Sequence, residues 1–330
     1  MTQSTVILAH PFAAEVMAEL ASRFRLIVPP AGRSLAETVR AEPAVEALIS
    51  FLSDPVDRDL LALAPALRIV ANFAVGTNNI DIAAARAREI YVTNTPDILT
   101  EATADLTWAL LLAVARRIVE ADGFTREGRF SGWQADLFLG KELAGGICGV
   151  VGLGRIGLAV ARRALGFGMR VLYTSRHRKP DLERRYGFEF TGFPDLLRRA
   201  DVVSPHLAYE PGLHHLFGRD AFALMKPDAI FLNVARGALV NEVALIEVLE
   251  GGRLFGAGLD VYEAEPAVSA RLQRLPNVVL APHIGSATTA TRTGMARMAA
   301  VSVGQALAGG IPDHLVPEWS RPLPSPPTPG

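Results

Sequence analysis

Short apolar runs alternate with longer helical patterns along the first hundred residues of this chain. The apolar runs cover residues 5–9, 26–28, 47–51 and 67–73, and helical spacing of apolar positions covers residues 13–22 and 80–88. Runs of this length separated by helical segments are typical of parallel βα units. The pattern predicts a first α/β domain built on a parallel sheet.

A second series of apolar runs begins at residue 146. It covers residues 147–152, 170–173, 202–204, 230–234, 256–259 and 278–281, with helical patterns at 155–165, 195–199 and 242–250. Six strands that alternate with helices in this order fit a complete doubly wound sheet. The predicted fold class is therefore α/β, with two Rossmann-like doubly wound parallel sheets.

Two more helical patterns lie outside these series. Residues 100–123 are apolar on nearly every side, which predicts one long helix that another domain or a second subunit must cover. Residues 286–308 predict a last helix that carries the chain away from the second sheet and back to the first domain. Residues 321–330 are half proline, and we expect them to be disordered.

Composition narrows the class of protein. A chain of 330 residues that is 50% apolar can bury a large core and is long enough for about two domains. Its net charge of -1 argues against a nucleic-acid or membrane surface, and its longest apolar run, around residues 106–115, is too short to span a bilayer. The N-terminus lacks a signal-peptide pattern, so we expect a cytoplasmic protein. The single cysteine, Cys148, lies in an apolar run and is expected to be buried and inert.

A glycine-rich turn follows the first strand of the second series. Gly152, Gly154 and Gly157 stand between that strand and a predicted helix. In a dinucleotide site the first glycine permits the tight turn, the second lets the backbone approach the pyrophosphate, and the third lets helix and strand pack closely. A glycine turn without a ligand is the alternative, which the agreement of strand, spacing and helix disfavours. The predicted contacts are Gly152, Leu153, Gly154, Arg155, Ile156 and Gly157.

The second strand of this series bears on the choice of cofactor. An acidic residue at its end would bind the ribose 2′-hydroxyl of NAD, but here the strand is followed by Ser175, Arg176, His177, Arg178 and Lys179. Ser175, Arg176 and Arg178 could instead bind a 2′-phosphate. We therefore predict a preference for NADP(H), with NAD(H) as the cofactor that the site could also take. The alternative is an ordinary solvated basic loop.

Three charged or titratable residues follow the glycine turn in order: Arg236, Glu265 and His283. A guanidinium can grip a carboxylate at two points, a histidine can transfer a proton near neutral pH, and a carboxylate beside the histidine orients it and favours its protonated form. Taken singly, each residue could instead cap an element, occupy a turn or satisfy the backbone. Together they suit hydride chemistry on a 2-oxo acid. No histidine cluster has the spacing of metal ligands, and no metal is predicted.

These motifs resemble one family, the D-isomer-specific 2-hydroxyacid dehydrogenases, and within it the glyoxylate/hydroxypyruvate reductases. The resemblance covers nearly the whole chain and is carried by residues 72–81, 152–157, 233–237, 258–263 and 282–286. It implies a substrate domain made of residues 1–99 and 287–330, and a cofactor domain of residues 100–286 with the active site in the cleft between them. Residues 100–140 would include the helix and arm that form a homodimer.

The same resemblance implies roles for individual residues. Arg236 would hold the substrate's carboxylate and keto oxygen, His283 would donate a proton to that oxygen, and Glu265 would pair with His283. Backbone N–H groups of Val75 and Gly76 would cradle the carboxylate. Leu52 is expected to line the substrate pocket. Trp133 is expected either to shape the pocket of a neighbouring subunit across a dimer interface or to be simply an anchor of that interface. Further cofactor contacts are expected at Thr103, His206, Ala235, Asp260 and Gly285, with Asp260 at the nicotinamide carboxamide.

Three functions remain open from the sequence. The favoured one is an NADPH-preferring reductase of small 2-oxo acids, glyoxylate and hydroxypyruvate first, that forms D-2-hydroxy acids. The alternatives are an NAD-dependent dehydrogenase of a larger D-2-hydroxy acid, and a dinucleotide-sensing protein like the family's transcriptional corepressors, which keep the same triplet. Measurable turnover would separate an enzyme from a sensor.

Overall fold

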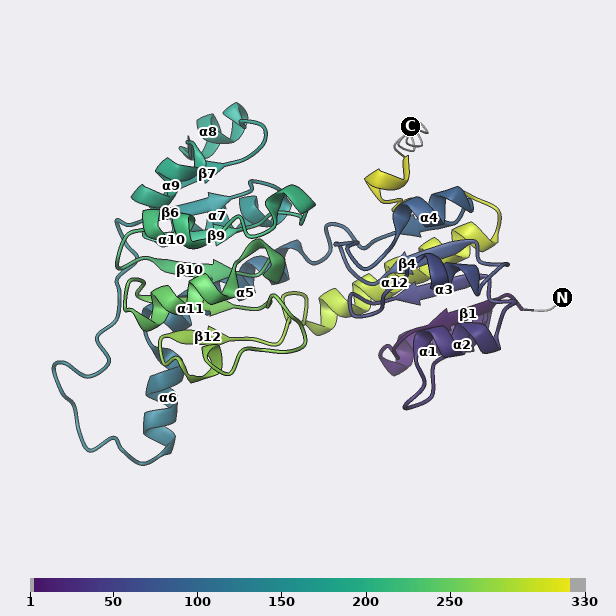
Figure 1. Cartoon of the computed structure of the whole chain (residues 1–330), viewed down its shortest axis with the longest axis horizontal. Helices are drawn as coiled ribbons and strands as arrows, with labels where there is room; N and C mark the ends of the chain where they lie inside the picture. Colours follow the sequence, from purple (N-terminus) through teal and green to yellow (C-terminus); the bar gives the residue numbers. More distant parts are fainter. Residues whose placement is uncertain (1–2, 321–330) are drawn as a thin grey trace, which may run out of the picture. The chain divides into compact units, whose positions relative to one another are not determined.

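A computed structural model describes residues 3–320 of the chain (Figure 1). It divides into two compact units, one made of the residues up to Leu99 together with those from Thr288 onward, the other of Thr100–Ala287. The proline-rich segment 321–330, expected to be disordered, lies outside the described residues.

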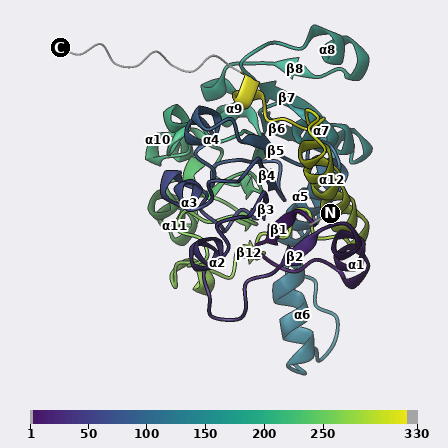
Figure 2. The same cartoon turned by 90° about the vertical axis from the view of Figure 1, so that its right-hand side faces the viewer.

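The first unit is built on a five-stranded parallel sheet with strand order β2-β1-β3-β4-β5. Nearly every residue of β1, β3 and β4 is apolar, and all are buried, as expected for parallel strands covered on both faces. Figure 2 shows α1 and α12 on one side of these strands and α2, α3 and α4 on the other. The elements are β1 (Thr5–Leu8), α1 (Ala14–Arg23), β2 (Arg25–Ile27), α2 (Leu35–Ala41), β3 (Ala47–Ser50), α3 (Arg58–Ala62), β4 (Ile69–Asn72), α4 (Ile82–Ala87), β5 (Tyr91–Thr93) and α12 (Thr289–Leu307).

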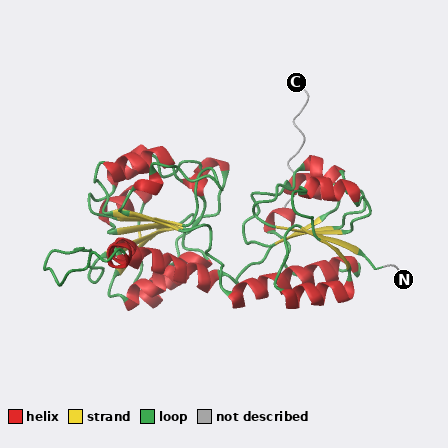
Figure 3. Cartoon of the chain, turned by 90° about the horizontal axis from the view of Figure 1, so that it is seen from below, coloured by secondary structure: helices red, strands yellow, loops and turns green. Residues whose placement is uncertain are grey.

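The second unit is built on a seven-stranded parallel sheet with order β12-β11-β10-β9-β6-β7-β8. Helices α5 and α7 share one buried apolar cluster with the sheet, and α9, α10 and α11 share another. Figure 3 shows helices on both faces of this sheet. The elements are α5 (Thr100–Ala115), α6 (Ile118–Arg126), β6 (Ile147–Val151), α7 (Arg155–Gly166), β7 (Arg170–Thr174), α8 (Pro180–Tyr186), β8 (Glu189–Phe190), α9 (Phe193–Arg199), β9 (Val202–Pro205), α10 (Arg219–Leu224), β10 (Ile230–Asn233), α11 (Glu242–Glu250), β11 (Gly256–Leu259) and β12 (Val278–Leu280).

These two parallel sheets confirm the α/β fold class predicted from the sequence. The first strand of this unit, β6, lies between β7 and β9. The strand order therefore reverses between β6 and β9. In open α/β sheets ligands bind at the carboxyl ends of the strands at such a switch point. That edge of the second sheet is therefore where a dinucleotide is expected.

The long helix expected over residues 100–123 is wrong in its extent. Helix α5 ends at Ala115, and Arg117 takes a left-handed conformation (φ 51) before α6 begins. The returning chain ends α5: the N–H of Lys141 donates to the carbonyl of Ala115 at 2.7 Å. Gly140 packs so closely on the same carbonyl that a Cβ would lie 2.3 Å from it. The helix thus ends at a tertiary contact with a segment distant in sequence.

The prediction of six strands in the second unit is also incomplete. The seventh strand, β8, has two residues, Glu189 and Phe190, and both are exposed. It pairs only with β7, at the edge of the sheet. A strand so short and so exposed leaves no apolar run in the sequence.

Two expectations from composition can be compared with the fold. Cys148 is buried in β6, and burial raises the pKa of its thiol to about 12, so the thiol is inert near neutral pH. Among residues 3–320, no helix has the length and apolar character that crossing a membrane requires.

Candidate active site

The glycine turn after β6 has the geometry of a dinucleotide site. Gly152 has φ 99, and a Cβ there would lie 2.6 Å from the carbonyl oxygen of His206. A Cβ on Gly157 would lie 2.1 Å from the carbonyl oxygen of Gly152, so two of the three glycines are required by packing alone. A Cβ on Gly154, the N-cap of α7, would meet nothing within 4 Å. The turn thus fits a phosphate that approaches the free N–H groups at the start of α7.

Other expected cofactor contacts gather at the same edge of the second sheet. His206 follows β9, its Nε2 lies 2.9 Å from Ser204 Oγ, and burial lowers its pKa to about 3, so the ring is neutral. Thr103 of α5 lies beside Gly285, because a Cβ on Gly285 would be 3.4 Å from Thr103 Cγ2. Two other residues of the fingerprint contribute to packing. Leu153 is buried, and Ile156 packs against the apolar cluster that α5 and α7 share.

The basic loop after β7 differs from expectation in one respect. Both arginines already contact carboxylates: Arg176 Nη2 lies 2.8 Å from Glu210 Oε2, and Arg178 Nη2 lies 2.7 Å from Glu183 Oε2. Ser175 Oγ donates to the carbonyl of His177 at 2.6 Å. Sequence reasoning considered only the loop itself and missed both carboxylates. A 2′-phosphate would have to compete with them for the guanidinium groups.

Arg236 is held by its own loop at the carboxyl end of β10. The side-chain amide of buried Asn233 donates to the carbonyl of Arg236 at 2.9 Å, and its oxygen accepts from the N–H of Ala235 at 3.0 Å. Arg236 Nη1 donates to the carbonyl of Ala235 at 2.6 Å. Burial lowers the pKa of Arg236 from its ordinary value and the nearby Glu265 carboxylate raises it. A guanidinium is not deprotonated in proteins, so Arg236 stays charged near neutral pH.

Glu265 and His283 form a direct pair at the ends of β11 and β12. Glu265 Oε2 lies 2.9 Å from His283 Nδ1, and Glu265 Oε1 accepts from the N–H of Tyr262 at 2.9 Å. Burial alone would raise the pKa of Glu265, but the bonds from His283 and Tyr262, with the charge of Arg236, hold it below its ordinary value. The carboxylate is therefore ionised, and His283 Nε2 is the nitrogen that can present a proton to a substrate.

Close backbone packing joins the loops that carry the triplet. A Cβ on Gly237, next to Arg236, would overlap the carbonyl of Tyr262, so the two loops touch through their backbones. His283 takes a left-handed conformation, with φ 54, which is unusual outside glycine and clusters at functional sites. The carboxylate of Asp260 fixes the chain after it by accepting from Ile284 N at 2.7 Å and Gly285 N at 2.8 Å. The structure thus brings Arg236, Glu265 and His283 together within one unit.

Asp260 has a role that the sequence did not suggest. It is 1% exposed, and both of its oxygens accept backbone N–H groups of the loop that follows His283. Burial raises the pKa of Asp260, partly offset by these two bonds. Its expected contact with a nicotinamide carboxamide stays a prediction. The hydrogen bonds in the structure give Asp260 a positioning role, because they fix the backbone directly after His283.

The expected substrate contacts are divided between the two units. Leu52, Val75 and Gly76 belong to the first unit, whereas the triplet and Trp133 belong to the second. The carbonyls of Val75 and Gly76 are held by side-chain amides, from Asn94 at 2.8 Å and Asn72 at 2.7 Å. These bonds fix the peptide groups whose N–H donors are expected to bind a carboxylate. Trp133 is 85% exposed in the loop after α6, which extends away from the second sheet in Figure 1.

Sequence reasoning also missed an aromatic group beside Leu52. His10 Nε2 lies 3.0 Å from Asp54 Oδ1, and Asp54 Oδ2 accepts from the N–H of Phe51 at 2.8 Å. The rings of Phe12 and Phe73 pack against Phe51 with centroids 5.7 and 4.8 Å away. All follow the carboxyl ends of β1, β3 and β4. The position of His10 directly after the first strand could have drawn attention to it.

One group of potential metal ligands was also missed. His214, His215 and Glu263 bring their ligand atoms within 4.8 Å of one another. However, His215 Nε2 already lies 2.5 Å from Glu263 Oε1, and Glu263 Oε2 accepts from the N–H of Glu242 at 3.1 Å. These contacts join the loop of His214 and His215 to the loop of Glu263 and to the start of α11. The group could not be found by spacing, because Glu263 is 48 residues from His215.

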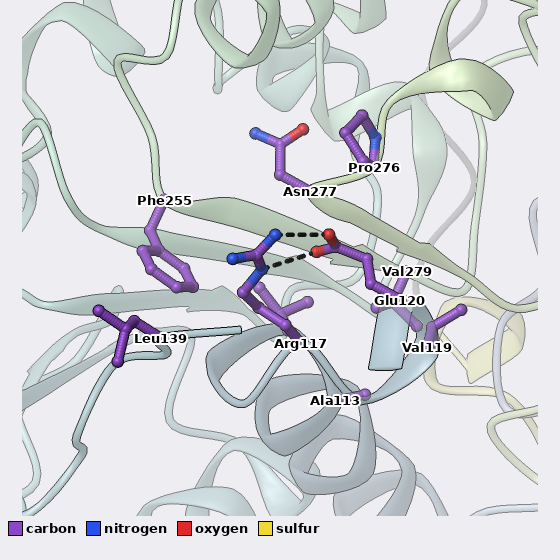
Figure 4. Close-up of a pocket in the computed structure, with 10 residues that line it drawn as sticks. Ala113, Arg117, Val119, Glu120, Leu139, Phe255, Pro276, Asn277 and Val279 are labelled. Carbon is purple, nitrogen blue, oxygen red and sulfur yellow. Dashed lines mark hydrogen bonds and ion pairs between the residues drawn. The ribbon is translucent and has the colours of Figure 1, made fainter. Parts of the chain in front are cut away.

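One pocket of the second unit lies away from the triplet. It has a volume of about 210 Å³ and lies at the amino ends of β11 and β12, beside Phe255 and Asn277 (Figure 4). The triplet follows the carboxyl ends of the strands. Arg117 and Glu120 form an ion pair at the pocket, and Leu139 of the returning arm lines it. The pocket belongs to the α6 region rather than to the candidate active site.

Comparison with known proteins gives consistent results. The family model described as "D-isomer specific 2-hydroxyacid dehydrogenase, NAD binding domain" matches residues 108–285. A glyoxylate reductase of Thermococcus litoralis is 51% identical over 292 residues, 87% of each chain. One of Thermococcus kodakarensis is 48% identical over 303 residues, 90% of this chain and 91% of its own.

Solved structures extend the likeness to the fold of most of the chain. The TT0316 protein of Thermus thermophilus has a TM-score of 0.88 and 43% identity, covering 94% of this chain and 99% of its own. An NADPH-dependent glyoxylate/hydroxypyruvate reductase of Sinorhizobium meliloti, solved with NADP and malonate, has a TM-score of 0.87 and 31% identity, covering 96% of this chain and 98% of its own.

Proposed function

Because the chain belongs to the D-isomer-specific 2-hydroxyacid dehydrogenase family, we propose that it reduces small 2-oxo acids, glyoxylate and hydroxypyruvate first, to D-2-hydroxy acids. Family membership makes the protein an oxidoreductase that uses a nicotinamide dinucleotide. The observation that carries the choice of substrate is the 51% identity to a glyoxylate reductase over 87% of both chains. The paired Glu265 and His283 beside Arg236 supply the groups that this reaction needs.

Each member of the triplet has a part in the proposed reaction. When bound, the nicotinamide supplies a hydride to the keto carbon. Arg236 binds the substrate carboxylate and the keto oxygen, where negative charge develops. His283 gives the proton on Nε2 to that oxygen, so hydride and proton together yield the alcohol. Glu265, 2.9 Å from Nδ1, orients the ring and places a negative charge beside it. The parts expected of Leu52, Val75 and Gly76 stay predictions.

We also propose a preference for NADP(H) over NAD(H). No carboxylate stands among residues 175–179 after β7, where an NAD-binding site would place one, and the arginines of this loop offer a cationic partner to a 2′-phosphate. The similar Sinorhizobium meliloti enzyme is named NADPH-dependent and was solved with NADP. The alternative is an NAD-dependent dehydrogenase of a larger D-2-hydroxy acid. The cytoplasmic location expected from the sequence also stays a prediction.

Initial velocities with glyoxylate and hydroxypyruvate, each with NADPH and NADH, test both proposals. We expect turnover with both acids and a kcat/KM that is about tenfold or more higher with NADPH, the scale of one charge-assisted contact. A higher kcat/KM with NADH would contradict the cofactor preference alone. Dinucleotide binding without turnover of either acid would contradict the reductase and favour a sensing protein.

The exposed arm supports a homodimer. Helix α6 has no buried residue, and its apolar side chains Ile118 and Val119 are exposed, as are Phe130 and Leu139 in the following loop. A run of exposed apolar side chains marks an interaction site. We propose that this arm contacts a second copy of the chain, as the family resemblance implies. A monomeric mass by light scattering at micromolar concentration would contradict this.

Replacing Glu265 by glutamine tests the pair. The amide keeps the size of the side chain but removes the carboxylate that contacts His283 Nδ1, so the ring loses its ionic partner. The kcat/KM for glyoxylate near pH 7.5 should fall about tenfold or more, the scale of one charge-assisted contact. Steady-state kinetics measure this fall, with the Kd for NADPH as the control. A kcat/KM equal to that of the wild type would show that Glu265 takes no part in the reaction.

A further inference from the structure

The two arginines of the basic loop are held in different ways. Arg176 Nη2 contacts Glu210 Oε1 at 2.9 Å and Oε2 at 2.8 Å, and the two side chains are 68% and 55% exposed. Arg178 donates from Nε and Nη2 to Glu183, at 2.9 and 2.7 Å, and Glu183 is only 14% exposed. The first contact is a surface ion pair through one guanidinium nitrogen, and the second is a two-point grip.

The partner of Arg178 is itself anchored. Glu183 Oε1 also accepts from the hydroxyl of Tyr173 at 2.7 Å, and the Tyr173 ring is buried beneath the loop. The Arg178 guanidinium lies 5.9 Å from the Phe190 ring centroid, and Lys179 N donates to the same Tyr173 hydroxyl at 2.7 Å. Moving Arg178 to a ligand would break a contact that organises the loop. Moving Arg176 would break only an exposed pair, which contributes little net stability.

Arg176 and Glu210 also lie on the two loops that flank the dinucleotide fingerprint. Arg176 comes two residues after β7 and Glu210 five residues after β9, and β6 lies between these strands in the sheet. The glycine turn follows β6, and His206 at the start of the Glu210 segment packs against Gly152. The ion pair therefore joins the loops on either side of the dinucleotide fingerprint. The ribose 2′ position of a bound dinucleotide is expected beside the loop after β7.

We propose that Arg176 binds the 2′-phosphate of NADP(H), that Arg178 is a structural part of the loop, and that Glu210 is a specificity-determining residue. Glu210 holds Arg176 in place when no phosphate is present, and its carboxylate competes with the phosphate and repels it. The preference for NADP(H) is then set by the attraction of Arg176 for the 2′-phosphate, reduced by the competition and repulsion from Glu210. This inference rests on the proposed preference for NADP(H).

Calorimetric binding of adenosine 2′,5′-bisphosphate and of 5′-AMP to the intact protein tests the assignment without turnover. The wild type should bind the bisphosphate more tightly than 5′-AMP. R176A should weaken bisphosphate binding about tenfold or more, as for loss of a charge-assisted contact, and leave 5′-AMP binding unchanged. R178A should weaken bisphosphate binding by less than about threefold, and E210Q should strengthen it about two- to fivefold, the range of an exposed ion pair.

The outcomes separate this inference from the proposal on which it rests. If the wild type binds both nucleotides equally, the NADP preference itself is wrong, and the assignment is wrong with it. The wild type could bind the bisphosphate more tightly than 5′-AMP while R178A loses as much bisphosphate affinity as R176A, or while E210Q gains no bisphosphate affinity. The assignment is then wrong, and the NADP preference stands. The affinity for 5′-AMP and the thermal unfolding midpoint report on folding. R178Q serves as a second variant if R178A does not fold.

Discussion

Replacing His283 by asparagine should lower kcat for glyoxylate reduction about 10²- to 10⁴-fold, the usual contribution of a positioned general acid. Asparagine suits the site because it tolerates the left-handed backbone that His283 adopts, with φ 54, so the loop should keep its shape. The amide cannot supply a proton to the keto oxygen at a useful rate. The measurement is kcat at saturating NADPH and glyoxylate.

The affinity for NADPH is the control for this variant. Asp260 still accepts from the N–H groups of Ile284 and Gly285, so the loop beside the cofactor site should remain in place. The Kd for NADPH should change little. A kcat within about threefold of the wild type would be far below the contribution of a general acid and would assign the proton transfer to another group.

Replacing Arg236 by glutamine should lower kcat/KM for glyoxylate about 10³-fold, because the substrate loses a two-point cationic contact at its carboxylate and keto oxygen. The change also removes a positive charge beside Glu265, one of the contributions that hold the pKa of that carboxyl below its ordinary value. Loss of the contact with the substrate carboxylate should raise the KM for glyoxylate, and loss of the contact with the keto oxygen should lower kcat. Steady-state kinetics at fixed, saturating NADPH measure both.

Arg236→Lys is the matched variant. It keeps the charge but loses the planar fork, so we expect it to recover only a small part of the kcat/KM that glutamine loses. Unaltered binding of NADPH in both variants would show that the loop, fixed by Asn233 and by the close approach of Gly237 to Tyr262, is intact. A kcat/KM for the glutamine variant equal to that of the wild type would remove Arg236 from the substrate site.

Much of the fold could be predicted because parallel strands covered on both faces leave continuous apolar runs. Ile147–Val151 and Ile230–Asn233 are buried along their whole length, and both were predicted from the sequence. Strand β8 left no such run, because Glu189 and Phe190 are exposed. The end of α5 depends on Lys141, which comes back to Ala115 from the far side of α6. A helix end set by a distant residue has no local signal.

The candidate site shows the same division. The order of Arg236, Glu265 and His283 after a glycine turn was visible in the sequence, and so was the absence of an acid after β7. The partners of the site residues were not visible. Glu210 lies 34 residues from Arg176, and Asp260 reaches the backbone of Ile284, 24 residues further on. Such contacts depend on which strands lie side by side. The order β9-β6-β7 decides the first contact, and the pairing of β11 with β12 decides the second.

The configuration of the glycerate formed from hydroxypyruvate and NADPH tests the central proposal most directly. Reduction at a site where Arg236 fixes the substrate and His283 protonates its oxygen should give one enantiomer, because only one face of the ketone then meets the hydride. We expect D-glycerate, in equal amount to the NADPH consumed, by chiral chromatography of the product. L-glycerate, a racemic product, or no glycerate at all would contradict the proposal.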